Sequence, residues 1–84
     1  MPKYPILTDG RLVEVDVEDE QEQRMVRGYW GRGVQSFLTH GRTDRLGDFR
    51  GQRVGGFPLE TDPDVISDWA ERNPEFDPGE LYES

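Results

Sequence analysis

Residues 26–38 read Val26-Arg27-Gly28-Tyr29-Trp30-Gly31-Arg32-Gly33-Val34-Gln35-Ser36-Phe37-Leu38 and carry the clearest hydrophobic periodicity in the chain. Counted from the first of these residues, the apolar side chains fall at offsets 0, 3, 4, 8, 11 and 12, which is the spacing of one helical face. This spacing predicts a long helix over residues 18–39. Its core-facing side chains would be Val26, Tyr29, Trp30, Val34, Phe37 and Leu38.

The flanks of this stretch supply signals for both ends of the helix. The acidic residues Asp19, Glu20 and Glu22 suit the positive end of the helix dipole, and Gly41 is a typical helix stop. The interior contains three glycines, each of which costs about 1 kcal/mol relative to Ala in a helix. They are Gly28, Gly31 and Gly33. The helix therefore either depends on tertiary packing or breaks at these positions.

The segment before the helix predicts a β-hairpin over residues 4–17. Asp9-Gly10 is a strong signal for a two-residue turn, because both positions accept a positive φ. After the turn, three valines alternate with acidic residues, so the second strand should bury one face. Pro5 confines the first strand to a sheet edge, because proline has no backbone N–H to donate.

The segment after the helix predicts smaller elements. Residues 43–49 suggest one short helical turn, and residues 50–59 suggest a short hairpin or bend around Gly55-Gly56. Asp62 precedes Pro63, which predicts a capped helix from there to about Arg72. Residues 74–84 form either a docked final turn or a flexible acidic tail.

These elements predict a single small domain, residues 1–84, of the α+β class. A small antiparallel sheet, made of the N-terminal hairpin and the short strands, should pack against two helices. We expect Trp30, Phe37, Val65 and Trp69 to be buried. The chain has no cysteine and no apolar run of membrane-spanning length, so we expect a cytoplasmic protein without a disulfide scaffold and with no membrane partner.

The net charge of −8 is unevenly distributed along the chain. Residues 1–23 carry a net charge of −5, residues 24–56 carry +5 with seven Arg and two Asp, and residues 57–84 carry −8. A basic middle therefore lies between two acidic ends. The ends could fold back and neutralise the middle, or the protein could present a surface of two signs that selects its partners.

No arrangement of residues suggests catalysis. His40 is the only histidine and no cysteine is present, so neither a nucleophile motif nor a zinc site can be assembled. The acidic run from Asp16 fails as a calcium loop, because Gln21 and Arg27 stand where that loop needs Gly and Glu. The glycines form neither a P-loop nor a dinucleotide fingerprint. We therefore expect no enzyme activity, no cofactor and no bound metal.

The charge layout favours a protein-binding regulator or adaptor, such as an inhibitor or accessory factor of a larger bacterial complex. The predicted contacts are Arg42, Arg45, Arg50 and Arg53 on the basic side and Glu60, Asp62, Asp64 and Asp68 on the acidic side. Replacing the four Arg with Ala should abolish binding and leave the fold intact.

Two alternatives remain open from the sequence. The Arg-rich middle, residues 24–53, could be a nucleic-acid-binding module, since Arg and Gly interleaved with Tyr29 and Trp30 resemble RGG-type segments that stack on RNA. The strip cleared by Gly28 and Gly31 on the polar face of the helix would suit a protein partner or a second copy of the chain in a homodimer.

From residue 29 onward the chain resembles a set of small actinobacterial or phage-borne proteins of unknown function. The resemblance is carried by Tyr29-Trp30, Phe37-Leu38, Gly41, Leu46, Phe49-Arg50-Gly51, Val54, Leu59-Glu60-Thr61-Asp62-Pro63-Asp64, Ile66 and a tail of the Phe76…Leu81-Tyr82 kind. The Leu-Glu-Thr-Asp-Pro-Asp run is its most distinctive part. It implies a bacterial or phage origin and carries over no activity or site residue.

Overall fold

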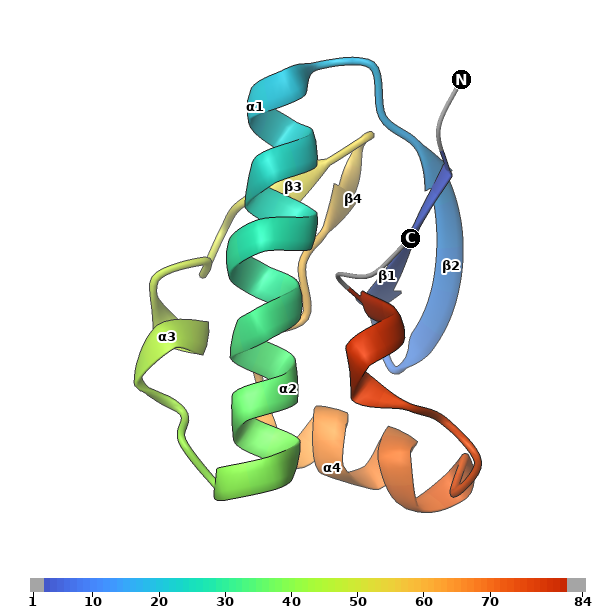
Figure 1. Ribbon diagram of the computed structural model, residues 1–84, viewed down its shortest axis with the longest axis vertical. Helices are drawn as coiled ribbons and strands as arrows, with labels where there is room; N and C mark the ends of the chain where they lie inside the picture. Colours follow the sequence, from blue (N-terminus) through green and yellow to red (C-terminus); the bar gives the residue numbers. More distant parts are fainter. Residues whose placement is uncertain (1–2, 82–84) are drawn as a thin grey trace.

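The computed structural model describes residues 3–81, and Figure 1 shows a long helix beside two hairpins, with a second helix crossing at one end. In chain order the elements are β1 (Lys3–Thr8), β2 (Arg11–Asp16), α1 (Glu20–Gln23), the π-helix η1 (Arg24–Trp30), α2 (Gly31–His40), α3 (Asp44–Gly47), β3 (Arg53–Val54), β4 (Phe57–Pro58), α4 (Pro63–Arg72) and the 3₁₀ turn η2 (Pro78–Leu81). The α+β class predicted from the sequence is confirmed.

The N-terminal hairpin forms as predicted. β1 and β2 pair antiparallel, and Asp9 and Gly10 both take positive φ values of 51° and 76°, as a type I′ turn requires. Tyr4, Ile6 and Thr8 are buried on one face of β1, and the neighbouring Leu7 is buried on the other. Because both faces of β1 are covered, this strand lies inside the molecule even though its sheet has only two strands.

The predicted long helix is continuous from Glu20 to His40 in three segments, α1, η1 and α2. The side chain of Asp19 caps its start by accepting a hydrogen bond from the backbone N–H of Gln21 at 2.9 Å. Gly41 ends the helix in the left-handed conformation, with φ 73°. The internal glycines therefore do not break the helix; η1, which contains Gly28, is wound as a π-helix.

One residue of the predicted inner face points the other way. Val26, Trp30 and Val34 are fully buried, but Tyr29 is 62% exposed, so its prediction as a core residue was wrong. In the π segment the Gly31 N–H donates to the carbonyl of Val26, five residues earlier. A turn closed in this way holds more than 3.6 residues, so residues four apart share the buried face and Tyr29 turns outward.

The segment after the long helix packs α3 and a second hairpin against the core. Leu46 of α3 is fully buried. β3 and β4 pair with each other and not with the first hairpin, so the expected single sheet is two sheets of two strands. Gly55, at the tip of this second hairpin, has φ 58° and lies so close to Val15 that a β-carbon there would overlap the valine side chain.

α4 begins and ends where the sequence predicted. The Asp62 side chain accepts a hydrogen bond from the Asp64 N–H at 2.9 Å, and Pro63 occupies the first turn. Trp69 is buried, whereas Val65 is only half-buried, contrary to the prediction. Val65 lies against the first hairpin, since a β-carbon on Gly10 would lie 3.8 Å from its Cγ1 atom.

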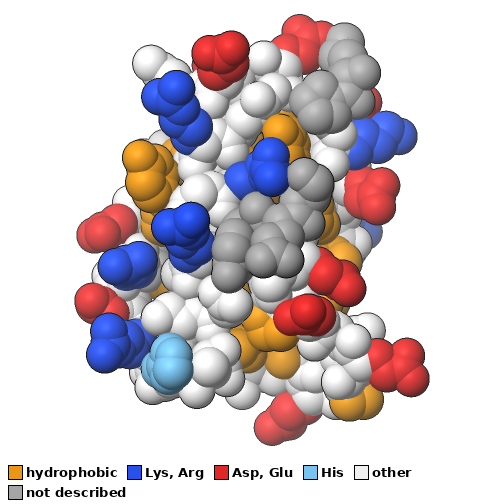
Figure 2. Space-filling model, viewed as in Figure 1, with side chains coloured by type: hydrophobic (Ala, Val, Ile, Leu, Met, Phe, Trp, Pro, Cys, Tyr) orange, Lys and Arg blue, Asp and Glu red, His pale blue; other side chains and the backbone are white. Residues whose placement is uncertain are grey.

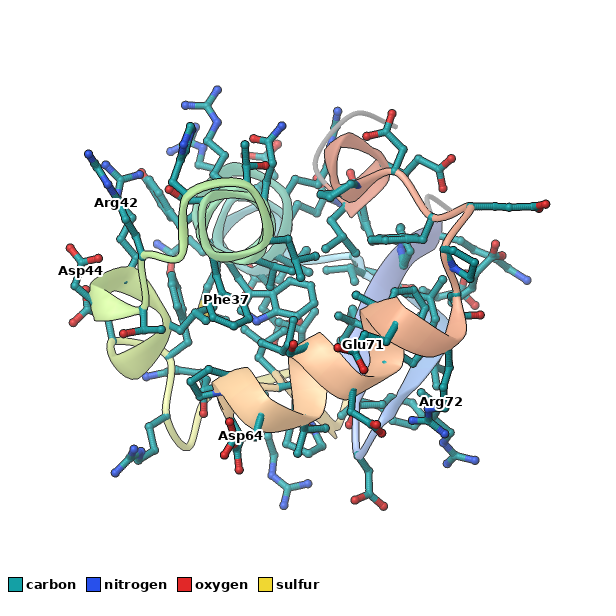
Figure 3. All side chains as sticks on the ribbon, turned by 90° about the horizontal axis from the view of Figure 1, so that it is seen from below. Phe37, Arg42, Asp44, Asp64, Glu71 and Arg72 are labelled. Carbon is teal, nitrogen blue, oxygen red and sulfur yellow. The ribbon has the colours of Figure 1, made fainter. Side chains whose placement is uncertain are left out.

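Phe37, also predicted to be buried, is half-buried and lies between α2 and α4 in Figure 3. It packs against the edge of the core because it belongs to the last turn of α2.

The chain after α4 folds back onto the core. The ring of Phe76 meets that of Trp69 edge to face, with centroids 4.5 Å apart. η2 then packs between α2 and β1, and Leu81 is 1% exposed. Of the two alternatives for this segment, the docked turn is therefore formed as far as residue 81, and the remaining residues of the expected tail, 82–84, lie outside the described part.

The buried side chains form one cluster between the long helix, the first hairpin, α4 and η2. Trp30 lies within it, and its indole N–H donates to the Glu60 carbonyl at 2.9 Å. This bond ties the middle of the long helix to the loop that leads into α4. Within residues 3–81, no helix has the length and apolar character needed to cross a lipid bilayer.

Candidate functional site

A basic cleft of about 440 Å³ opens between the first half of the long helix and the start of β1. We call it the Arg cleft. It is lined by Tyr4, Glu20, Gln23, Arg24, Arg27, Gly28 and Arg32. Gln23 is held in place by a hydrogen bond from its side-chain amide to the Val17 carbonyl at 2.8 Å.

Arg27 forms the inner wall of the cleft. Its guanidinium carbon lies 5.4 Å from the centroid of the Tyr4 ring, which is within the range of a cation–π interaction. The Nε atom of Arg27 is buried and has no hydrogen-bond partner within the described chain. A buried N–H on a charged group without an acceptor is costly, so this side chain is held with an unsatisfied donor.

Arginine side chains dominate the lining of the cleft. Three guanidinium groups and the carboxylate of Glu20 line it. Between residues 3 and 81, no carboxylate pairs with Arg24 or Arg27 at ion-pair distance. The cleft is therefore a concave, positively charged surface that can receive an anionic group.

The π-helical segment positions this site. Arg24 and Arg27 belong to η1, and Gly28 adds open space beside them, since no heavy atom lies within 4 Å of a β-carbon built there. Single π turns inside α-helices occur frequently at functional sites. The same segment turns Tyr29 into solvent, three residues before Arg32, so an exposed aromatic ring is carried by the helix that lines the cleft.

The four predicted basic contacts lie apart from this cleft, on the connection from α2 through α3 to β3. All four side chains are exposed, and they are Arg42, Arg45, Arg50 and Arg53. We call them the α3 arginines. Figure 3 shows Arg42 beside Asp44, both pointing away from the core. The Arg53 guanidinium donates to the Gly56 carbonyl at 3.1 Å and thereby supports the second hairpin.

Figure 2 shows how the two signs of charge are distributed on one face. Lys and Arg side chains gather over the long helix and its left flank, where acidic side chains also lie, and further acidic side chains lie at the top, the right and the bottom of the view. Basic side chains are thus concentrated over the long helix on this face, with acidic ones around and among them.

The predicted acidic contacts mostly have partners within the chain. Asp62 caps α4, and the Glu60 carboxylate lies 3.4 Å from the Asp62 N–H. Asp68 pairs with Arg72 at 3.3 Å, one helical turn away. Asp64 is exposed in the first turn of α4, and Figure 3 shows it and Arg72 toward opposite ends of that helix. The four acids lie along α4 and the loop before it.

The described residues contain no group of three or more His, Cys, Asp or Glu side chains placed to hold a metal ion. His40 is exposed in the last turn of α2, where a cationic side chain suits the helix dipole.

Arg24, Arg27 and Arg32 belong to the Arg-rich middle of the sequence, but the cleft itself was not predicted. Its other wall is Tyr4, a residue 23 positions away from Arg27 on a different element. No local pattern connects these two residues. The available signal was Gly28 between two arginines, which indicated space on the polar face of the helix.

No protein-family model matches the chain, and no solved structure matches it significantly. The chain is similar to a Rickettsia conorii (strain ATCC VR-613 / Malish 7) protein named "Putative surface cell antigen sca1", with 34% identity over 60 residues. The match covers 68% of this chain and 3% of that protein. The chain thus corresponds to a small part of a much longer relative.

Proposed function

We propose that this protein is a non-catalytic, protein-binding regulator or adaptor that receives an acidic segment of its partner in the Arg cleft. The observation that carries the proposal is the presence of the Arg cleft and the exposed ring of Tyr29 on the same helix. Tyr and Arg are the residue types that most often dominate binding energy at protein interfaces. The other large aromatic residues of the described chain are buried or half-buried, so core packing does not account for Tyr29.

The surroundings of the cleft support a protein as the partner. The whole chain carries a net charge of −8, and the segment that leads into the cleft is acidic, with Asp19, Glu20 and Glu22. A long polyanion would meet this segment and be repelled. A folded protein can instead place one acidic group in the cleft and pack an apolar surface on Tyr29. The α3 arginines would then add long-range attraction and speed association.

The test compares two variants with equal changes in charge. Tagged protein captures partners from a nuclease-treated bacterial lysate, using the wild type, an Arg24→Gln/Arg27→Gln variant and an Arg45→Gln/Arg50→Gln control. We expect the first variant to lose the specific partner and the control to retain it. Circular dichroism confirms that each variant is folded.

Each other result of this capture experiment has a definite meaning. If only the Arg45→Gln/Arg50→Gln control lost the partner, the contact would lie at the α3 arginines and not at the cleft. Replacing Arg42, Arg45, Arg50 and Arg53 together with Ala should then abolish binding. A partner that binds all forms equally would contradict a basic contact surface.

A nucleic-acid-binding module is the second candidate, and the exposure of Tyr29 is the observation that favours it. A solvent-facing ring between arginines can stack on an unpaired base. If nucleic acid is the ligand, partners captured from an untreated lysate should be absent after nuclease treatment. Affinity for duplex DNA would fall with salt at a log–log slope of about −0.9 per phosphate neutralised, and a flat salt response would eliminate this candidate.

A further inference from the structure

We infer that β2 presents a free strand edge, which takes up an extended basic segment of a protein partner as an added antiparallel strand. The surface consists of Leu12, Glu14 and Asp16, which we call the β2 edge, and a pocket that adjoins it. None of these three residues lines the Arg cleft, so the inference stands independently of the proposed function.

The register of the first hairpin decides which backbone groups face outward. Its two-residue turn makes Thr8 and Arg11 the first hydrogen-bonded pair, and the pairs alternate from there. The N–H and C=O groups of the β2 edge therefore point away from β1. The same alternation directs the carbonyl of Leu7, the partner of Leu12, out of the other side of the hairpin, where it accepts from the Glu60 N–H at 2.9 Å.

The two sides of the hairpin differ in what covers them. In Figure 1, β2 lies at the right margin of the molecule, and no other ribbon is drawn outside it. Within residues 3–81, the outward N–H groups of the β2 edge donate to no other segment. The second hairpin approaches only the far end, where a β-carbon on Gly55 would lie 3.3 Å from the Asp16 carbonyl. The edge is thus open from Leu12 to the Asp16 N–H.

A pocket of about 470 Å³ adjoins this edge at Leu12. Its apolar walls are Leu12, Trp69, Pro74 and Phe76. Because Leu12 is 38% exposed, a strand laid along the edge would cover it and bring one apolar side chain to the pocket. In recognition by strand addition, main-chain hydrogen bonds supply affinity and pockets for alternate side chains supply specificity. The β2 edge and this pocket provide both.

The charges of the edge select a basic strand. Glu14 and Asp16 follow Leu12 at alternate positions, so all three side chains lie on one face of β2. Both acids are exposed, and neither forms an ion pair within residues 3–81. On β1, Lys3 stands across from Asp16, whereas the uncharged Pro5 stands across from Glu14, so Glu14 should select more strongly.

The antiparallel arrangement fixes the order of side chains in the partner segment. From its N-terminus, the segment should carry a basic residue opposite Asp16, a second basic residue opposite Glu14 and an apolar residue opposite Leu12, at alternate positions.

A second copy of the chain fits this edge poorly. Two β2 strands paired over Leu12 to Asp16 would place Glu14 directly opposite Glu14 of the other copy, and like charges at such positions are destabilising. Charged side chains on edge strands commonly prevent self-association in this way. The same carboxylates that repel another β2 edge attract a strand with Lys or Arg at these positions.

The experiment titrates ¹⁵N-labelled protein with the end-blocked peptide Thr-Lys-Thr-Lys-Thr-Leu-Thr and follows the backbone amide signals by NMR. We expect the signals of Leu12 and Glu14 to shift and their hydrogen exchange to slow when the peptide binds. The acidic counterpart Thr-Glu-Thr-Glu-Thr-Leu-Thr should bind at least about tenfold more weakly, because its carboxylates would face those of the β2 edge.

Two methylated peptides separate strand addition from attraction between charges. A methyl group on the backbone nitrogen of the second lysine removes an N–H that would bond to Glu14. A methyl group on the next threonine nitrogen alters an N–H that would face away from β2. The first change should weaken binding about tenfold or more, and the second should leave it unchanged.

Variants of Glu14 provide the same distinction in the protein. Glu14→Pro removes an outward N–H at a position where the strand can hold proline, as Pro5 already does across the hairpin. It should abolish peptide binding in protein that is folded by circular dichroism. Glu14→Gln removes only the charge and should weaken binding about twofold to fivefold. Asp48→Asn, an exposed acid beside α3, is the control and should bind as the wild type does.

The remaining results would each contradict the inference. Equal affinity for the acidic peptide, or full binding of the peptide methylated on lysine, would overturn it, and the methylated pair decides even if Glu14→Pro fails to fold. A dimer that forms without peptide and is lost in folded Glu14→Pro protein would assign the edge to a second copy. Absence of basic-peptide binding would overturn the inference and leave capture through Arg24 and Arg27 unaffected.

Discussion

Gly28 and Gly55 occupy opposite environments, so an added methyl group should have opposite effects on stability. Gly28 lies in a helical segment with open space beside it, whereas Gly55 has φ 58° and would place a β-carbon onto Val15. We predict that Gly28→Ala raises the free energy of unfolding by about 0.5–1 kcal/mol. Gly55→Ala should lower it by about 1–3 kcal/mol through left-handed strain and overpacking.

Urea unfolding followed by tryptophan fluorescence measures both changes. Gly33→Ala is a useful comparison, because its β-carbon would lie 3.5 Å from Leu46, an ordinary contact distance. A stabilised Gly55→Ala protein would contradict the close approach of the second hairpin to β2.

Trp69 joins α4 to the hydrophobic core, so its removal should strongly lower the free energy of unfolding. Its side chain is 7% exposed and stacks edge to face on Phe76. We predict that Trp69→Ala costs about 3–5 kcal/mol, which approaches the total stability expected of a domain this small. Far-UV circular dichroism at 37 °C should show a largely unfolded protein. A fully folded variant would mean that α4 contributes little to the core.

α4 contains both an N-terminal cap and a surface ion pair, whose contributions to stability can be compared. Asp62 accepts a hydrogen bond from the helix backbone, whereas Asp68 only pairs with Arg72 on the surface, with both side chains more than half exposed. We predict that Asp62→Ala lowers stability by about 1 kcal/mol and that Asp68→Ala lowers it by less than about 0.5 kcal/mol. Thermal unfolding of the two variants measures this difference, and equal losses would refute the capping role.

The elements with local signals were predicted well from the sequence. The turn at Asp9-Gly10, the helix stop at Gly41 and the cap at Asp62 each depend on a few neighbouring residues, and all three lie where expected. Long-range features were not predictable in this way. The underwound η1 turns Tyr29 outward, although simple helical periodicity placed it inside.

The candidate site was predicted only in part for the same reason. The excess of arginine in the middle of the chain was visible in the sequence, but its division into a cleft and the separate α3 arginines depends on how β1 packs on the long helix. The wall formed by Tyr4 becomes apparent only when the two elements are in contact.

For the whole molecule, the net charge of −8 predicts how stability and binding respond to salt. Salt screens the repulsion among acidic side chains and so stabilises the folded state. It also screens the exposed ion pair of Arg72 and Asp68, but that pair contributes little to the free energy of unfolding. We predict that moving from low to physiological salt raises the melting temperature by a few degrees. The same change should weaken capture of an acidic partner. Differential scanning calorimetry in a salt series checks the first effect, and a falling melting temperature would show that attraction between charges stabilises the fold.

The position of η2 has a consequence for how the chain folds as it is synthesised. Leu81 is fully buried between the long helix and β1, and it leaves the ribosome after all the other buried apolar residues of the described core. Until it emerges, the apolar face of the long helix lacks one of its walls, however early the first hairpin forms. Translation therefore delivers an open core that closes in a single late step, and a pause before that step would leave Trp30 and its neighbours accessible to chaperones.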